Sequence, residues 1–372
     1  MRTASVTTRV TSLATRVAAT MVATVVTIAA CALTGCWDSV ELEERAFVNA
    51  VGADMKDGER AAALSVSSLD ALIGEKSEDK SGDSVKKGFG ASFTAALREA
   101  DGMSSKRAYF GHTKVIVFGE NLLRDQEAFS EALDALERDN EISDKLLTVA
   151  TDGEASEILE KNAPGEPSAG LFATYFYKNK RSSLKLDLAT LSRRLHENGC
   201  ALIPKIETRD KQLKLSGAAV ISNGELVGWM DEKNLSGLAW ISGERGALIN
   251  IPSGVVLSVS KIKNKLKFYD KDNGVTCVAE INVTGEIVED NNGQLQRREI
   301  EKLCEDEINK QTLNSFLAFK ELKADGFRLA EAIRKFEPSI YERYDGDETA
   351  LFDAMDLEPR ATVSISGTGS IG

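Results

Sequence analysis

The first 36 residues constrain this chain most, because they decide in which compartment the remainder folds. Residues 1–16 carry three arginines and no acidic residue, and residues 17–32 are uncharged and mostly apolar. That order is typical of a secretory signal peptide. The segment Leu33-Thr34-Gly35-Cys36 follows at once, with small residues before a cysteine. We therefore predict that residues 1–35 are removed and that Cys36 carries a diacylglyceryl lipid, whose two acyl chains would hold the exported protein to a membrane.

Two alternatives to this reading remain open. Residues 17–35 approach the roughly 20 apolar residues that an uncleaved transmembrane anchor needs. The lipid could also attach to Cys31, which follows an aliphatic and two small residues, Ile28-Ala29-Ala30. Polar sequence starts directly after Cys36-Trp37, whereas cleavage before Cys31 would leave Ala32-Leu33 on the mature side. That difference favours Cys36.

Composition excludes several classes of function. The chain has 372 residues, with 46 basic and 58 acidic side chains and a net charge of -12. That length suffices for two or three domains. An acidic chain in which no basic stripe stands out argues against nucleic acid as a partner. The two histidines, His112 and His196, lie far apart in the sequence, which disfavours a zinc site or a histidine-based triad. We expect no metal, no cofactor and no catalytic residues.

The cysteines and a few polar residues have structural interpretations. Three cysteines remain after Cys36 and permit at most one disulfide; we predict buried, unpaired thiols at Cys200, Cys277 and Cys304. His112 follows a glycine and precedes an apolar run, which favours a structural histidine that bonds neighbouring backbone. Pairs of acids such as Glu289-Asp290 are expected by chance in so acidic a chain.

Residues 36–200 alternate between strand and helix patterns. Apolar runs predict strands at 46–54, 62–66, 113–118 and 146–150. Helical spacing predicts helices that contain Phe93 to Ala100 and Leu133 to Leu136, followed by helices at 155–159, 168–177 and 188–195. Residues 74–87 are charged and rich in Ser and Gly, which is typical of a mobile loop. We expect a mixed α/β N-terminal domain without a dinucleotide-binding glycine motif.

Residues 210–372 have a different pattern. Asn223-Gly224 between apolar runs at 213–221 and 226–229 predicts a hairpin. Asp231 is placed to cap a short helix that carries Trp240, and we expect Trp229 and Trp240 to be core residues. Strands at 247–251, 255–262, 266–269 and 276–288 should form an antiparallel meander, against which a helix at 295–322 packs. A final strand is expected at 361–365. The predicted fold class is α+β, with an antiparallel sheet domain packed on one long helix.

A series of short segments follows in order along the chain: Gly35-Cys36-Trp37-Asp38 with Glu41-Leu42, Tyr109-Phe110-Gly111-His112-Thr113-Lys114 with Gly119-Glu120, Arg138-Asp139-Asn140-Glu141-Ile142, Ala155-Ser156-Glu157-Ile158-Leu159, Gly217-Ala218-Ala219-Val220, Leu226-Val227-Gly228-Trp229, Ser236-Gly237-Leu238-Ala239-Trp240 and Ala324-Asp325-Gly326-Phe327. Taken together, this set resembles the Ger(x)C lipoproteins, the C subunits of spore nutrient germinant receptors. Family members usually carry a tryptophan before the last strand, where this chain has Tyr341, Tyr344 and Phe352. That departure concerns local packing.

The resemblance implies a role in spore germination. It implies a non-catalytic lipoprotein on the outer face of the spore inner membrane, working with polytopic A and B receptor subunits in assembly or function. It also implies a three-part mixed α/β fold, in which the N-terminal domain would consist of two interleaved subdomains. The alternative is the lipid-anchored binding protein of an ABC transporter, which would need a hinged pair of largely parallel domains; the predicted meander disfavours that.

Overall fold

The computed structural model describes residues 16, 18–25, 27, 44–67, 84–160, 184, 186–210, 212–243, 248–271, 274–290, 293 and 295–368. The chain forms two units, Met1–Arg45 and Ala46–Gly372. In the first unit, the described residues between 16 and 27 are helical and exposed. Among the described residues, no helix combines the length and the apolar character needed to span a membrane. The signal-peptide prediction for residues 1–35 and the lipidation prediction for Cys36, with its alternative Cys31, concern residues that are largely outside this description.

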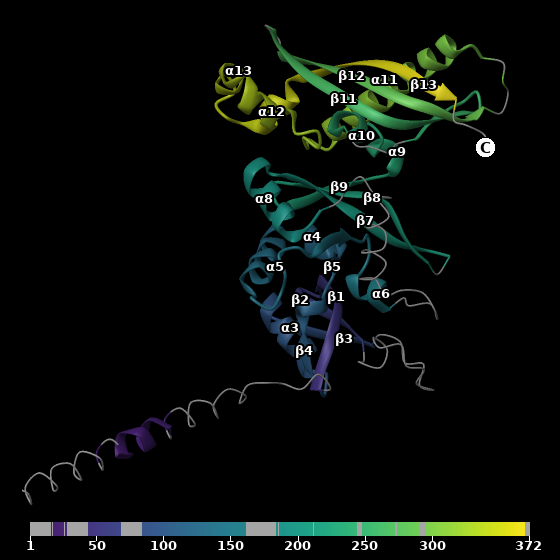
Figure 1. Ribbon diagram of the computed structural model, residues 1–372. Helices are drawn as coiled ribbons and strands as arrows, with labels where there is room; N and C mark the ends of the chain where they lie inside the picture. Colours follow the sequence, from purple (N-terminus) through teal and green to yellow (C-terminus); the bar gives the residue numbers. More distant parts are fainter. Residues whose placement is uncertain are drawn as a thin grey trace, which may run out of the picture. The chain divides into compact units, whose positions relative to one another are not determined.

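A nine-stranded sheet dominates the first half of the second unit (Figure 1), in the order β3-β2-β1-β5-β6-β7-β8-β9, with β4 paired to β1. Its central neighbours β1, β5, β6 and β7 run parallel, and the flanking pairs β2–β1, β3–β2, β7–β8 and β8–β9 are antiparallel. The strands are β1 (Arg45–Lys56), β2 (Glu59–Ser67), β3 (Ser84–Gly90), β4 (Arg107–Tyr109), β5 (Val115–Phe118), β6 (Leu147–Ala150), β7 (Cys200–Arg209), β8 (Gln212–Ser222) and β9 (Glu225–Met230).

Helices cover both faces of this sheet. Alternate residues of β5 enter two separate cores: Ile116 and Phe118 pack on one face, Val115 and Val117 on the other. The first core also contains buried residues of α3 (Phe93–Gly102), α4 (Glu120–Leu123), α5 (Gln126–Arg138) and α8 (Leu188–Asn198), and the second contains those of α6 (Ala155–Glu160). A strand buried on both faces needs a continuous apolar run, which is why β1, β5 and β6 could be predicted.

The second half builds a four-stranded sheet in the order β10-β11-β12-β13. Its strands are β10 (Leu248–Ile251), β11 (Val255–Lys271), β12 (Gly274–Asp290) and β13 (Met355–Thr368), and its helices are α9 (Glu232–Leu235), α10 (Leu238–Ser242), α11 (Arg297–Glu321), α12 (Leu329–Phe336), α13 (Pro338–Glu342) and α14 (Glu348–Asp353). The long helix α11 packs on this sheet, and its Ile300, Cys304 and Ile308 share a core with Ile281 and Val283 of β12.

Several predictions for the second half are confirmed. Asn223 and Gly224 have φ of 52° and 82° between β8 and β9, as the hairpin requires. The Asp231 side chain accepts a hydrogen bond from the backbone N–H of Asn234 and caps α9; the expected single helix is however two, and Trp240 lies on the second, α10. Trp240 is buried, with its indole N–H bonded to Gln311 Oε1 at 2.9 Å. The long helix begins and ends within two residues of the expected positions.

Other predictions for the second half are corrected. The strands expected at 255–262 and 266–269 are one strand, β11, because β12 pairs with it throughout. The last strand pairs with β12 in parallel, so this sheet is mixed rather than purely antiparallel. Trp229 is only half-buried, with the Lys205 ammonium 5.4 Å above its ring.

Corrections also arise in the first half. Residues 84–87, expected in a mobile loop, belong to β3, which pairs with β2. The hairpin strands β8 and β9, which were expected in the region 210–372, continue the N-terminal sheet through β7, where Ala150 of β6 pairs with Lys205 of β7. The expected helix at 168–177 lies outside the described residues.

Strand β11 carries a short row of lysines, although no basic stripe was expected from the sequence. Lys261, Lys263, Lys265 and Lys267 alternate along the strand and therefore share one face of the sheet. The order of strands leaves this part of β11 at an edge, because β10 pairs only with residues 255–258. Lysines on an exposed edge strand oppose pairing with other chains, so we interpret this row as protection of the edge.

Candidate functional site

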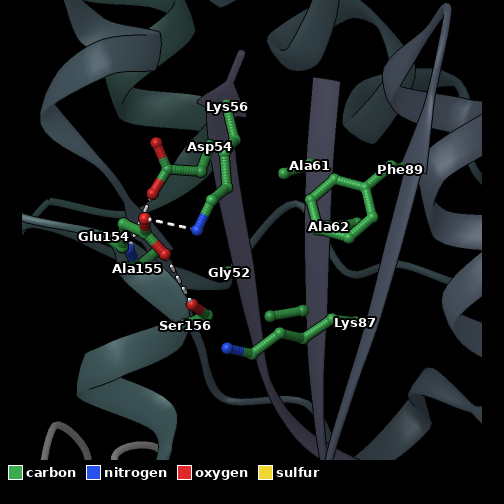
Figure 2. A pocket seen from close by; sticks show the side chains of 11 residues that line it. Gly52, Asp54, Lys56, Ala61, Ala62, Lys87, Phe89, Glu154, Ala155 and Ser156 are labelled. Carbon is green, nitrogen blue, oxygen red and sulfur yellow. Dashed lines mark hydrogen bonds and ion pairs between the residues drawn. The ribbon is translucent and has the colours of Figure 1, made fainter. Parts of the chain in front are cut away.

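The most developed polar cluster of the second unit lies where the parallel strands of the large sheet end (Figure 2). Asp54 lies near the end of β1. Glu154 directly precedes α6, the helix that follows β6, and Ala155 begins that helix. In open α/β sheets the carboxyl ends of parallel strands are the usual place for a ligand site. This end of the sheet is therefore the first region to test for one.

Asp54 connects β1 to α6 through backbone donors. Its Oδ2 accepts a hydrogen bond from the Ala155 N–H at 2.8 Å, and its Oδ1 accepts one from the Met55 N–H at 2.8 Å. A side chain at Gly119 could not fit here, because its Cβ would lie 2.1 Å from Asp54 Oδ2. The glycine of the Gly119-Glu120 segment thus makes room for the Asp54 carboxyl group.

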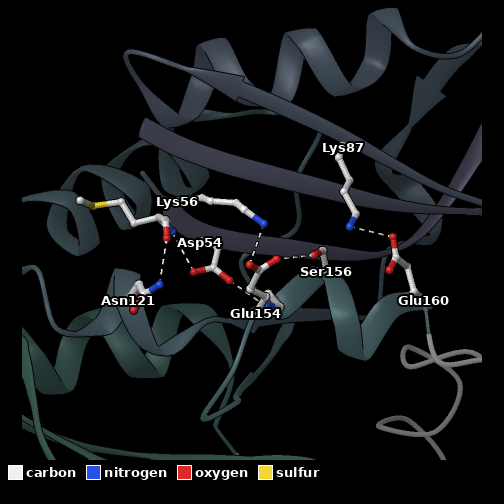
Figure 3. A network of polar contacts seen from close by, with 9 residues as sticks. Asp54, Lys56, Lys87, Asn121, Glu154, Ser156 and Glu160 are labelled. Atoms are coloured by element: carbon white, nitrogen blue, oxygen red, sulfur yellow. Dashed lines mark hydrogen bonds and ion pairs between the residues drawn. The ribbon is translucent and has the colours of Figure 1, made fainter. Parts of the chain in front are cut away.

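Charged side chains around Asp54 are paired with one another (Figure 3). The Lys56 ammonium donates to Glu154 Oε1 at 2.8 Å, and Ser156 Oγ donates to Glu154 Oε2 at 3.4 Å. Lys87 forms an ion pair with Glu160 at 2.8 Å. Each cation drawn in the figure already has its own carboxylate.

The pKa values of these groups follow from burial and pairing. Burial raises the pKa of Asp54 to about 6, although the backbone N–H groups of Ala155 and Met55 act in the opposite direction. The hydrogen bond between Lys56 and Glu154 raises the pKa of the ammonium and lowers that of the carboxyl group. At neutral pH this exposed pair is charged, so Lys56 is a poor base and Glu154 a poor acid.

The pocket beside these groups is small. Its volume is about 30 Å³, and Gly52, Ala61, Ala62, Ala63 and Phe89 complete its walls. That space holds about one water molecule, which is too little for a nutrient or a nucleotide. The cluster can exchange a proton at Asp54 and can hold α6 against β1. We interpret it as a structural junction.

The structure places His112 differently from the prediction. His112 ends a short 3₁₀ turn (Phe110–His112) and is exposed, and its ring meets Phe47 edge-on at 5.5 Å and Tyr109 at 5.9 Å. Among the described residues its imidazole has no hydrogen bond to backbone, so it does not bridge two segments. The neighbouring Thr113 does so instead: its hydroxyl donates to the Val48 carbonyl at 3.0 Å.

The thiol prediction is confirmed for all three positions. Cys200, Cys277 and Cys304 are free and buried, and burial raises the pKa of the first two to about 12 and of the third to about 11. Such thiols are inert at neutral pH because the thiolate is the reactive form. In the part of the chain that the structure describes, no group of three or more His, Cys, Asp or Glu side chains is arranged to hold a metal ion.

Sequence reasoning missed Asp54 and Thr113. Asp54 was the last residue of a predicted strand, and its partner Ala155 is distant in the sequence. The available signal was local: a single acid directly after an apolar run, in a region that predicts parallel strands. Thr113 was included in a strand, where threonine is an ordinary residue.

Comparisons with known proteins agree with this architecture. Residues 38–208 match the family model described as the spore germination protein N-terminal domain, and residues 216–369 match the one described as spore germination B3/GerAC like, C-terminal. The chain is 25% identical to spore germination protein YndF of Bacillus subtilis (strain 168), over 93% of this chain and 96% of that protein. It is 23% identical to spore germination protein B3 of the same organism, over 92% of this chain and 96% of that protein.

The crystal structure of the GerBC protein shares this fold. Its TM-score is 0.59 at 19% identity, and the match covers 88% of this chain and all of that one. Fold and site define a two-sheet α+β protein whose polar cluster is a structural junction. Since the two family models together span most of the sequence, the chain belongs to the Ger(x)C family of spore germination proteins.

Proposed function

We propose that this chain is the lipid-anchored C subunit of a spore nutrient germinant receptor. Cys36 would carry the lipid and hold the protein on the outer face of the spore inner membrane, beside polytopic A and B subunits. The protein would act in receptor assembly or signalling without catalysis. The observation that carries the proposal is the coincidence of a signal-like leader and Gly35-Cys36 with a body that matches spore germination models from residue 38 onward.

Tethering gives a physical reason for this arrangement. A lipid-anchored protein is confined to a thin layer beside the membrane, which raises its effective concentration around membrane subunits. Modest contacts then suffice for assembly. Without residues 1–35 the chain loses three arginines, which leaves 43 basic and 58 acidic residues and a net charge of 43 − 58 = −15. Attachment to an anionic membrane by charge is therefore disfavoured, and the lipid would supply it.

The test is a pair of cysteine variants in the spore-forming host. Cys36→Ala should leave a folded protein that is released from the membrane or mislocalised, and germination in nutrient should fail. Cys31→Ala is the matched control and should behave as wild type. Mass spectrometry of the purified protein should find the diacylglyceryl group on Cys36. Lipid on Cys31, an intact residue 1–35 segment in the mature protein, or normal germination of Cys36→Ala would each contradict the proposal.

Membership of the spore germination family over both halves of the sequence argues against the ABC-transporter alternative. Uptake and germination distinguish the two functions directly. Deletion should abolish the germination response while leaving nutrient uptake by vegetative cells unchanged. Lost uptake with normal germination would favour the transporter function.

A further inference from the structure

The second unit has a groove between α8, β7, α10, β11 and α12 that the proposed function does not explain. Its volume is about 520 Å³, within the range of small-molecule sites. Its charged lining residues are Arg194, Arg328, Glu331 and Lys335. The apolar ones include Leu202, Leu238, Ile241, Leu266, Phe327 and Phe336. The groove is therefore apolar, with a small number of charged groups.

The charges in this groove do not balance. Glu331 is 5% exposed and is bonded by both Arg328, at 2.6 Å from Nε, and Lys335. Arg194 is half-buried, and among the described residues it has neither a hydrogen bond nor an ion pair; its Nε is buried without a partner. Three cations thus face one carboxylate. Leaving a guanidinium desolvated and uncompensated is costly, which makes Arg194 the group that a ligand would satisfy.

The surroundings of Arg194 favour the binding of an anion. Its pKa is lowered, chiefly by burial and then by the nearby cations Arg328 and Arg193, whereas Glu331, which Arg328 and Lys335 already bind, acts in the opposite direction. An arginine side chain stays charged at neutral pH. The neighbouring Arg193 differs, since it is more than half exposed and lies 3.8 Å from Glu197. The two adjacent arginines of α8 therefore differ: Arg193 is exposed with a carboxylate partner, and Arg194 is half-buried with no ion-pair partner in the part of the chain that the structure describes.

We propose that this groove binds a small organic carboxylate with a short apolar tail, held by Arg194 through its carboxylate and by the apolar wall through its tail. A planar guanidinium matches a carboxylate with two parallel hydrogen bonds. Bare inorganic phosphate would leave the apolar lining unused. Phe336 is 74% exposed at the groove, and a bound tail would cover part of that ring. This activity goes beyond an assembly role, and it does not depend on the lipid anchor.

The experiment uses the full chain in detergent with three probes: hexanoate, hexylamine of the same chain length, and inorganic phosphate. Ligand-observed saturation-transfer NMR and thermal unfolding are read together. Hexanoate should give saturation transfer and raise the unfolding midpoint, because a ligand that binds only the folded state stabilises it. Hexylamine should do neither, and phosphate, which has no carbon-bound proton for saturation transfer, should leave the unfolding midpoint unchanged. Equal binding of hexanoate and hexylamine, or no binding of hexanoate, overturns the proposal.

The decisive variant is Arg194→Met, with Arg193→Met as its matched control. Removing an uncompensated cation should keep or raise the unfolding midpoint without ligand, while the affinity for hexanoate falls at least tenfold. Arg193→Met should keep the affinity within about twofold. Phe336→Ser should weaken hexanoate while the fold is unaffected, since that ring is exposed. If Arg194→Met lowers the midpoint and keeps the hexanoate affinity, the residue is structural and the proposal fails.

Discussion

The two sheets of this protein differ in how many of their faces are buried. In the first half, β5 and β6 are buried along their whole length, and alternate residues enter cores on opposite sides. In the second half, β11 and β12 are buried on the face that packs with α11. The other face carries exposed polar side chains such as Lys263 and Asn282 and, further along β12, the buried Val278. Sheets with parallel central strands are covered on both sides, whereas antiparallel pairs can face water. The comparison predicts that equivalent substitutions have unequal effects in the two sheets.

The largest expected effect is truncation of a phenylalanine in each sheet. Phe118 of β5 is 0% exposed, so Phe118→Ala should lower the free energy of unfolding by about 3–5 kcal/mol. Phe268 of β11 is only partly buried against its core. Phe268→Ala should therefore lower the free energy of unfolding by less than half as much. Denaturant unfolding of both variants, with a check that the m-value is unchanged, measures the difference. Equal losses would show that Phe268 is packed as fully in the second sheet as Phe118 is in the first.

A pH-dependent effect should be confined to the first sheet. The pKa of Asp54 is about 6 in the folded chain against 3.8 for an ordinary aspartate, so folding favours the protonated form. Its contribution to stability is full below about pH 4 and is lost as the pH rises through about 6. The shift of about two units corresponds to an upper limit of about 3 kcal/mol.

The measurement for Asp54 is the unfolding free energy of wild type and Asp54→Asn between pH 4 and pH 7. The difference, variant minus wild type, should become more favourable to the variant by about 2–3 kcal/mol across that range. Asp57→Asn, in the exposed turn after β1, is the matched control, because it removes an exposed carboxyl group and leaves the buried one of Asp54 in place. A flat difference for Asp54→Asn would mean that its carboxyl group is solvated.

The smallest of these effects concerns His112. Its ring contacts Phe47 and Tyr109 edge-on, and an aromatic pair contributes about 0.5–1.5 kcal/mol. His112→Ala should therefore lower the free energy of unfolding by about 1 kcal/mol. His112→Gln should cost about the same, because the ring makes the contact; a rescue by Gln would instead indicate a hydrogen bond. Lys114→Gln, at an exposed neighbour, is the control.

Much of the fold was predictable because local rules decided it. The Asn223-Gly224 turn, the Asp231 cap and the long helix α11 each depend on neighbouring residues. The sequence predicted two strands where β11 is one, because Lys263, Asn264 and Lys265 interrupt the apolar pattern. Backbone pairing with β12 continues through these residues and keeps the strand whole. Long-range pairing could not be found in this way.

The candidate sites were less predictable than the fold for the same reason. Asp54 acquires its role from Ala155, which lies in a different part of the chain. Arg194 and Arg328 are far apart in the sequence and line one groove only because α8 and α12 border it. Neither pair has a spacing that a sequence motif could reveal. Cys36 is the opposite case, since its interpretation depends entirely on adjacent residues.

The parallel pairing of β13 with β12 has a consequence for biosynthesis. Residues 355–368 are made long after β12, and until then β12 has a free edge over most of its length. A nascent or partly exported chain would thus expose backbone donors and acceptors of a long strand, which is a hazard for aggregation. The C-terminal sheet can close only when the ribosome has passed residue 368. A chain truncated before β13 should therefore be a substrate for chaperones and proteases.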